Sequence, residues 1–265
     1  MLKGVLFDLD DTLIDWSGFN SEWGALERKH LSGVFDYICA EIQPLDDFEA
    51  YCAEFGNRLL GAWTAARTTM RAPNLGTLLV ETSVAFGIPP EKLDAHRCLD
   101  AFKWQAIPNT KVFPEVPETL ALLRQHGIKI GIVTNAHQPM WIRDIEIQQH
   151  GIYDFFPDCR IAASDVGYLK PHPLIFQTAL RCIGTTPEET VFVGDDLQAD
   201  IVGAKAAGML AIWRQIARRP AFDPALDGAV APDETITSLA ELPGILDARF
   251  PGWRSADQRG AAHGA

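Results

Sequence analysis

The stretch GVLFDLDDTL, residues 4–13, joins a short apolar run to a cluster of acids. The run VLF is typical of a buried strand, and Asp8, Asp10 and Asp11 follow it within four positions. Carboxylates so close together repel one another, and a buried carboxylate without a partner is costly. The stretch therefore predicts a strand whose C-terminal end lies next to positively charged groups.

The bulk composition is that of an ordinary globular protein. The 265 residues are 47% apolar and 22% charged, with a net charge of -12 and no run of Lys and Arg. This charge argues against nucleic acid and anionic membranes as partners. Five scattered cysteines, no signal-peptide pattern and no apolar run of about 18 residues lead us to expect a cytoplasmic protein with reduced thiols.

From about residue 110 onward, apolar runs alternate with helical patterns. The predicted strands lie at 128–135, 160–164, 190–195 and 209–214, and the predicted helices at 114–125, 138–150, 173–184 and 200–208. Repeated strand–helix–strand units with short connections predict an α/β fold, a doubly wound (Rossmann-like) parallel sheet.

Residues 16–108 have helical periodicity and little strand signal. We therefore expect an all-helical insert here, within an α/β core made of residues 1–15 and 109–250. The last segment, 251–265, is rich in Gly, Ala and polar residues and is expected to be a flexible tail.

Polar side chains follow each predicted strand, where an open parallel sheet binds its ligands. Each alone could be a turn former or a helix cap, but together they form a set: Asp8, Asp10 and Thr12, then Thr134 and Asn135, then Lys170, then Asp195, Asp196 and Asp200. Clustered carboxylates favour a hard divalent cation such as Mg²⁺, which keeps waters and substrate phosphate among its ligands. The set thus predicts a site for a metal ion and a phosphoryl group.

Four segments in this order resemble the four motifs of the haloacid dehalogenase (HAD) superfamily. They are FDLDDTL (7–13), VTN (133–135), GYLKPHPLIF (167–176) and VFVGDDLQADIVGAKAAGM (191–209). The insert at 16–108 is similar in position to the α-helical cap of the branch that contains many small-molecule phosphatases. One departure is Tyr168-Leu169, which replaces an Arg often found just before the third-motif Lys.

The resemblance implies a role for each matching residue. Asp8 would be the nucleophile that becomes an aspartyl-phosphate, and Asp10 the general acid and base. Thr134 and Asn135 would bind the phosphoryl group, and Lys170 would bind it too and offset the negative charge. The implied catalytic set is Asp8, Asp10, Thr134 and Lys170.

The implied metal set is Asp8, Asp10 (through its backbone carbonyl), Asp195 and Asp200. Whether Asp196 or Asp200 supports the metal is left open, with Asp200 favoured. Asp11 is expected to have a local structural role.

The implied function is a Mg²⁺-dependent phosphatase, a phosphoric monoester hydrolase acting on a small phosphorylated metabolite. The alternatives are a phosphomutase or a 2-haloacid dehalogenase on the same fold, and a non-enzymatic phospho-signalling or scaffold protein. Family dehalogenases lack an acid at the position of Asp10, which argues against that chemistry. Monomer and homodimer stay undecided. Candidate substrate contacts in the cap are Trp16, Phe19, Trp23, Arg67, Arg71 and Lys103.

Overall fold

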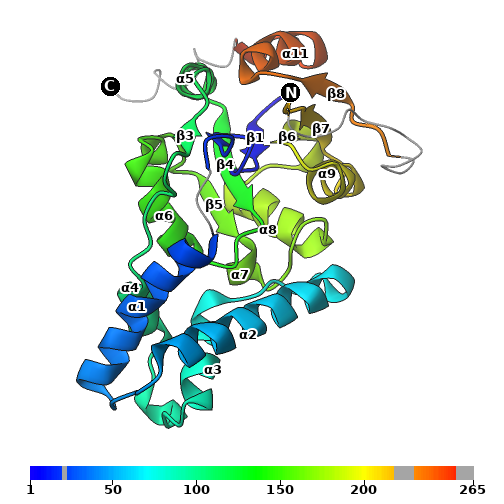
Figure 1. Cartoon of the computed structure of the whole chain (residues 1–265). Helices are drawn as coiled ribbons and strands as arrows, with labels where there is room; N and C mark the ends of the chain where they lie inside the picture. Colours follow the sequence, from blue (N-terminus) through cyan, green and yellow to red (C-terminus); the bar gives the residue numbers. More distant parts are fainter. Residues whose placement is uncertain (20–22, 218–229, 255–265) are drawn as a thin grey trace, which may run out of the picture.

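A six-stranded sheet forms the centre of the molecule, in the order β5-β4-β1-β6-β7-β8 (Figure 1). The computed structural model describes residues 1–19, 23–217 and 230–254. Every pair of neighbouring strands is parallel, and Leu6 of β1 lies opposite Gly131 of β4 on one side and Phe192 of β6 on the other. The strands are β1 (Gly4–Phe7), β4 (Lys129–Thr134), β5 (Cys159–Ala162), β6 (Thr190–Gly194), β7 (Leu210–Arg214) and β8 (Glu234–Ile236).

Helices cover both faces of this sheet, because alternate strand residues point to opposite sides. Val5 and Phe7 belong to an apolar cluster with α5 (Val116–Gln125), α6 (Met140–Gln149) and α11 (Leu242–Arg249). Leu6 belongs to the cluster on the other face, together with α8 (Pro173–Ile183) and α9 (Gly203–Ala206). The predicted doubly wound parallel sheet is confirmed.

One predicted helix has a different form. The segment expected as a helix at 200–208 begins earlier, as a π-helix, η4 (Leu197–Val202), and continues as α9. The remaining short elements are α7 (Ala163–Val166) and the 3₁₀ turns Pro90–Lys92, Tyr153–Phe155, Pro187–Glu189 and Leu239–Glu241. Strand β8 and helix α11 follow the last strand that the sequence pattern predicted.

Between β2 (Ile14–Asp15) and β3 (Lys111–Val112) the chain forms a group of helices. They are α1 (Trp23–Glu41), α2 (Phe48–Thr69), α3 (Leu75–Ala85) and α4 (Ala95–Phe102), coloured blue to green-cyan at the bottom of Figure 1. These helices share an apolar cluster, to which Ile142 of the core helix α6 also belongs. Strands β2 and β3 pair with each other in antiparallel fashion, so the insert leaves and re-enters the core at one place.

The C-terminal segment is anchored at its start. Trp253 is buried, and its Nε1 donates to Asp247 at 2.8 Å. The rest of the expected tail, residues 255–265, lies outside the described residues. In the described ranges, we find no helix whose length and apolar character would let it cross a bilayer.

Candidate active site

Asp8 lies directly beyond β1, and its backbone N–H donates to Val193 of β6 at 2.9 Å, which fixes it at the carboxyl edge. The residue is 7% exposed. Burial raises the pKa of Asp8 to about 7, although nearby Lys170 acts to lower it. The carboxylate is therefore placed where it needs positive charge to stay ionised.

Lys170 supplies that charge. Its Nζ lies 2.6 Å from Asp8 Oδ1 and 2.7 Å from Asp200 Oδ1, and it donates to the carbonyl of Val133 at 2.7 Å. Burial alone would lower the pKa of Lys170, but the carboxylates of Asp200 and Asp8 outweigh it and raise the pKa. The Asn135 side chain accepts from the Lys170 backbone N–H at 2.7 Å and donates to its carbonyl at 3.2 Å. Asn135 thus holds the lysine in position, and a direct contact to phosphate stays a prediction.

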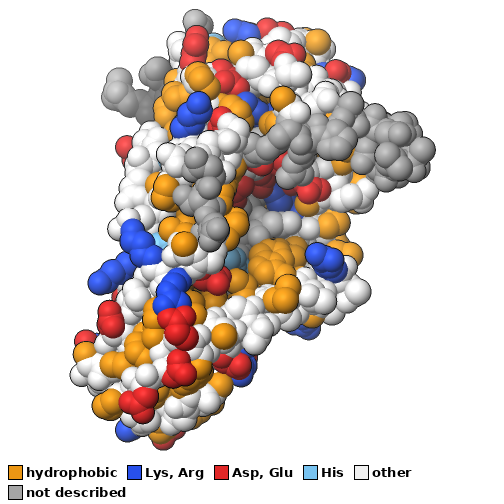
Figure 2. Space-filling view, viewed as in Figure 1, with side chains coloured by type: hydrophobic (Ala, Val, Ile, Leu, Met, Phe, Trp, Pro, Cys, Tyr) orange, Lys and Arg blue, Asp and Glu red, His pale blue; other side chains and the backbone are white. Residues whose placement is uncertain are grey.

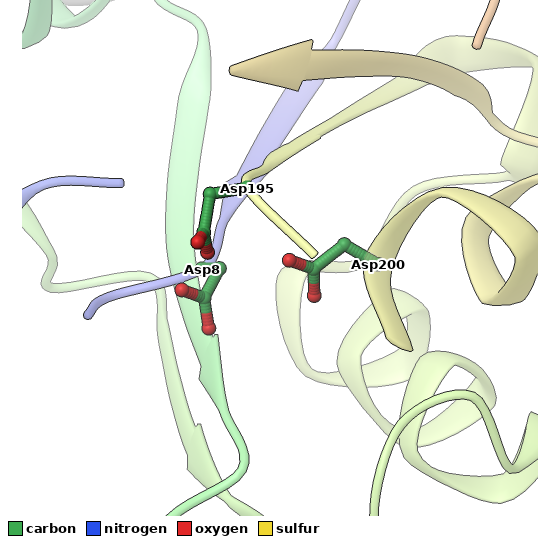
Figure 3. Close-up of side chains that lie close together, drawn as sticks. All are labelled: Asp8, Asp195 and Asp200. Atoms are coloured by element: carbon green, nitrogen blue, oxygen red, sulfur yellow. The ribbon is translucent and has the colours of Figure 1, made fainter. Parts of the chain in front are cut away.

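Asp195 and Asp200 complete a group of three buried carboxylates with Asp8 (Figure 3). One oxygen from each lies within 4.8 Å of the others. Oxygen donors at this density suit a hard divalent cation, so the donor chemistry fits the metal that the sequence predicts. Asp195 follows β6 and Asp200 lies in η4, so two adjoining elements position them.

Asp196 and Asp200 have different surroundings. The Asp196 carboxylate caps η4 by accepting from the backbone N–H groups of Gln198 at 2.9 Å and Ala199 at 2.8 Å. The Asp200 carboxylate points back into the site, with its Oδ2 accepting from the Asp196 N–H at 3.0 Å. A Cβ at Gly194 would lie 2.3 Å from that oxygen, so only glycine leaves room for the Asp200 carboxylate.

The Asp10 carboxylate borders the same cavity as this group of three but has partners of its own. Its Oδ1 accepts from Trp16 Nε1 at 3.0 Å and from Arg143 Nη2 at 2.7 Å. Thr134 Oγ1 donates to its Oδ2 at 3.4 Å. Asp10 and Thr134 thus lie together, and a metal contact through the Asp10 backbone stays a prediction. Asp11 has a positive φ of 65° and its carboxylate accepts from the Trp16 backbone N–H, which is a structural contact.

Three residues behind Asp10, Arg143, Glu146 and Trp104, belong to the site although the sequence pattern did not predict them there. Arg143 of α6 is 4% exposed, and its Nε lies 3.3 Å from Glu146 Oε2, which also accepts from Trp104 Nε1 at 3.3 Å. Burial raises the pKa of Glu146 to about 7, against the opposing effect of Arg143. Arg143 and Glu146 lie three positions apart on a helix. Charged pairs at this spacing are common on helices, so the sequence alone does not identify these two as site residues.

Two cavities meet at Asp10. The smaller, of about 160 Å³, is lined by Asp8, Asp10, Thr134, Asn135, Lys170, Asp195, Asp196, Ala199 and Asp200. The larger, of about 660 Å³, lies between the core and the helical insert. Asp10 and Asn135 line both. Figure 2 shows the surface hollowed between the core and the insert, with acidic side chains above and hydrophobic ones below.

Comparison with known sequences identifies relatives of the whole chain. The sequence profile described as "haloacid dehalogenase-like hydrolase" matches residues 2–208. A glyceraldehyde 3-phosphate phosphatase from Methanopyrus kandleri is 30% identical over 245 residues, covering 91% of this chain and 96% of the relative. A phosphoserine phosphatase from Thermus thermophilus is 28% identical over 260 residues, covering 91% of this chain and 98% of the relative.

Solved structures give the same grouping. A HAD phosphatase from Thermococcus onnurineus has a TM-score of 0.59 at 27% identity, covering 92% of this chain and 98% of the other. A 2-haloacid dehalogenase from Pseudomonas syringae has a TM-score of 0.62 at 26% identity, covering 94% and 99%. These matches confirm the resemblance inferred from the four motifs. The chain belongs to the haloacid dehalogenase-like hydrolase family and is a hydrolase.

Proposed function

We propose that the protein is a Mg²⁺-dependent phosphatase that hydrolyses a small phosphorylated metabolite through an aspartyl-phosphate on Asp8. The observation that carries this proposal is the small cavity, in which Asp8 faces Lys170 and borders Asp10. Its volume of about 160 Å³ equals the liquid share of roughly five water molecules, enough for a phosphoryl group with some water. The named phosphatases among the relatives support the same reaction class.

In the proposed first step an Asp8 oxygen attacks phosphorus while the bond from phosphorus to the leaving oxygen breaks, and Asp10 gives that oxygen a proton. In the second step Asp10 takes a proton from a water, whose oxygen attacks the phosphorus of the aspartyl-phosphate, releasing phosphate and restoring Asp8. The position of Asp10 supports this double role, because it lies where the two cavities join. Arg143 and Trp16 hold the Oδ1 atom of Asp10 in place.

The residues that would hold the metal are Asp8, Asp195 and, through its backbone, Asp10, with Asp200 in support. A bound Mg²⁺ would supply positive charge against the phosphoryl oxygens. Lys170 adds to this positive charge, and its ammonium offsets the repulsion between the Asp8 and Asp200 carboxylates. Because phosphoryl transfer depends mainly on positioning and charge, these contacts suit the reaction.

We also propose that residues 16–108 act as a cap on a core of 1–15 and 109–250. The apolar cluster that the helices of the insert share and the paired strands β2 and β3 at its base support this division. A cap at this position could cover the site and exclude water.

A phosphomutase would use the same residues, and a dehalogenase has the same fold. Against a dehalogenase stand Asp10, held beside Thr134, and the group of three buried acids, which a reaction without phosphate or metal does not need. Free phosphate released in equal amount to the alcohol product would distinguish a phosphatase from a mutase.

The direct test is hydrolysis of p-nitrophenyl phosphate by the purified protein with Mg²⁺ and with excess EDTA. Asp8→Asn should abolish turnover and leave no phosphoenzyme, whereas Asp10→Asn should lose about 10²–10⁴-fold and accumulate phosphorylated Asp8, since its base is missing. Asp11→Asn is the matched control, because Asn tolerates a positive φ and keeps the acceptor for Trp16. Full activity in EDTA, or an Asp8→Asn protein that retains more than about a hundredth of the rate, would contradict the proposal.

A further inference from the structure

Seven of the 18 residues that line the larger cavity beside Asp10 are Trp or Phe, and its polar lining residues are Asp10, Asp11, Glu27, His30, Asn135, His137, Gln138 and Arg143. Trp16 and Phe19 come from the segment that enters the insert, Trp63 from α2, Phe102 from the end of α4, and Trp104 from the segment after it. Their rings pack against neighbours, with centroids 5.8 Å apart for Trp16 and Phe19 and 6.2 Å for Phe102 and Trp104. Such packed rings form a rigid apolar surface.

The polar edges of two of these tryptophans are already used by the protein. Trp16 Nε1 donates to Asp10 at 3.0 Å, and Trp104 Nε1 donates to Glu146 at 3.3 Å. Buried indole N–H groups need such partners. Because these donors are occupied, the two rings offer mostly carbon surface to whatever enters the cavity.

Among the described residues that line the cavity, none is a cation free to bind a second anionic group, and burial lowers the pKa of the two lining histidines, His30 and His137. Among its described lining residues, Arg143 is the single Arg or Lys, and it is paired with Asp10 at 2.7 Å and lies 3.3 Å from Glu146. Glu27 lines the same cavity, and burial raises its pKa. A leaving group that carries its own negative charge would therefore be repelled without compensation.

The cationic candidates in the cap lie elsewhere. Arg67 lines a different cavity with Met70, Arg71 is exposed with its guanidinium 5.5 Å from the Tyr168 ring, and Lys103 is exposed at the end of α4. The aromatic candidates Trp16, Phe19 and Trp23, in contrast, all line the large cavity.

We infer that the substrates are phosphate monoesters of bulky, uncharged and largely apolar alcohols. This inference rests on the proposed phosphatase function. The phosphoryl group would lie in the small cavity, the leaving oxygen beside Asp10, and the organic part among the aromatic rings. Two of the relatives are named for the phosphates of small polar molecules, glyceraldehyde and serine, so this chain would differ from them in substrate class.

The test compares ethyl, butyl and hexyl phosphate, whose alcohols have nearly equal acidity, with glyceraldehyde 3-phosphate and phosphoserine. Each fully buried methylene should raise kcat/KM about three- to fourfold, so even partial burial of its four additional methylenes should let hexyl phosphate exceed ethyl phosphate by at least about thirtyfold. Hexyl phosphate should also exceed both polar substrates. A flat series, or a polar substrate that is turned over better, would overturn the inference.

Two neighbouring leucines of α2 provide a matched pair of variants. Leu59 lines the large cavity, and Leu60 is 68% exposed outside it. Leu59→Gln should reduce kcat/KM for hexyl phosphate at least about tenfold and leave ethyl phosphate within about threefold, while Leu60→Gln should change neither. Equal effects of the two variants would contradict the assignment of the cavity.

A binding measurement separates this inference from the proposed function. Ethyl and hexyl phosphate are titrated calorimetrically into the Asp8→Asn protein with Mg²⁺ present. If no phosphate ester is hydrolysed by the wild type yet hexyl phosphate binds at least about thirtyfold more tightly than ethyl phosphate, the cavity assignment stands and the proposed reaction fails. Equal binding of the two overturns the cavity assignment whether or not hydrolysis occurs.

Discussion

Lys170→Met removes an ammonium that lies between two buried carboxylates. Asp8 and Asp200, at 7% and 1% exposed, both contact its Nζ within 2.7 Å. Removing one member of a buried ion pair costs about 3–5 kcal/mol, because the remaining charges keep their desolvation penalty. In EDTA at pH 8, we expect the free energy of unfolding to fall by about that amount. Turnover should be lost as well.

The loss should depend on pH in a definite direction. Without Lys170, burial keeps the pKa of Asp8 and Asp200 above their unfolded values, so the folded variant binds more protons than the unfolded chain. Stability then falls as pH rises, and the deficit against wild type should be larger at pH 9 than at pH 6. Added Mg²⁺ should restore more stability to the variant than to wild type, because the carboxylates that have lost the Lys170 ammonium bind the cation more tightly in the folded state.

The assay is urea unfolding followed by tryptophan fluorescence, with the midpoint compared at constant slope. Lys205→Met is the matched control, because Lys205 pairs with Asp233 and both side chains are 30% exposed. That surface pair should contribute no more than about 1 kcal/mol. If Lys170→Met costs no more than Lys205→Met in EDTA, or its deficit does not grow with pH, the reasoning about the buried charge is wrong.

Three further predictions follow from the same contacts. Gly194→Ala should lower kcat at least about tenfold with little change in fold, measured with p-nitrophenyl phosphate, because its Cβ would displace the Asp200 carboxylate. Asp196→Asn should keep near wild-type activity, since Asn also caps helices, whereas Asp200→Asn should lose at least about tenfold in the same assay. Burial raises the pKa of Glu146 in the folded protein to about 7, so the stability that its protonated form contributes should be lost as pH rises from about 4.5 through 7. The loss should be at most about 1.4 kcal/mol per pH unit, and Glu146→Gln should flatten this part of the plot of Tm against pH.

The sheet and its carboxyl edge could be predicted because both depend on local pattern. Apolar runs identified β1, β4, β6 and β7, and parallel strands bring their carboxyl ends to one edge whatever lies between them. The polar residues after those runs therefore had to meet: Asp8, Thr134 and Asp195 do so, and Lys170 joins them from the segment before α8. The same local pattern says little about β8, a short edge strand of three residues.

The contacts behind Asp10 could not be predicted, because they join distant segments. Arg143 reaches Asp10 across 133 positions, and Trp104 reaches Glu146 from the end of the insert. Helical periodicity placed Arg143 on a helix but could not tell which face of that helix meets the insert. For the same reason the sequence pattern does not distinguish Arg67, Arg71 and Lys103, which lie outside the large cavity, from the aromatic residues that line it.

In the proposed mechanism, Asp10 connects the reaction site of the core to the cavity walls that the insert supplies. Its carboxylate borders the small cavity, and its Oδ1 accepts from Trp16, whose ring lines the large one. Trp16 comes directly after β2, the strand that pairs with β3 where the insert returns. A movement of the insert about this base that displaced Trp16 would strain or break its bond to Asp10. The proton-transfer group would thus be held in place most firmly when the aromatic wall is in position, which couples occupancy of the apolar cavity to readiness of the acid at the scissile bond.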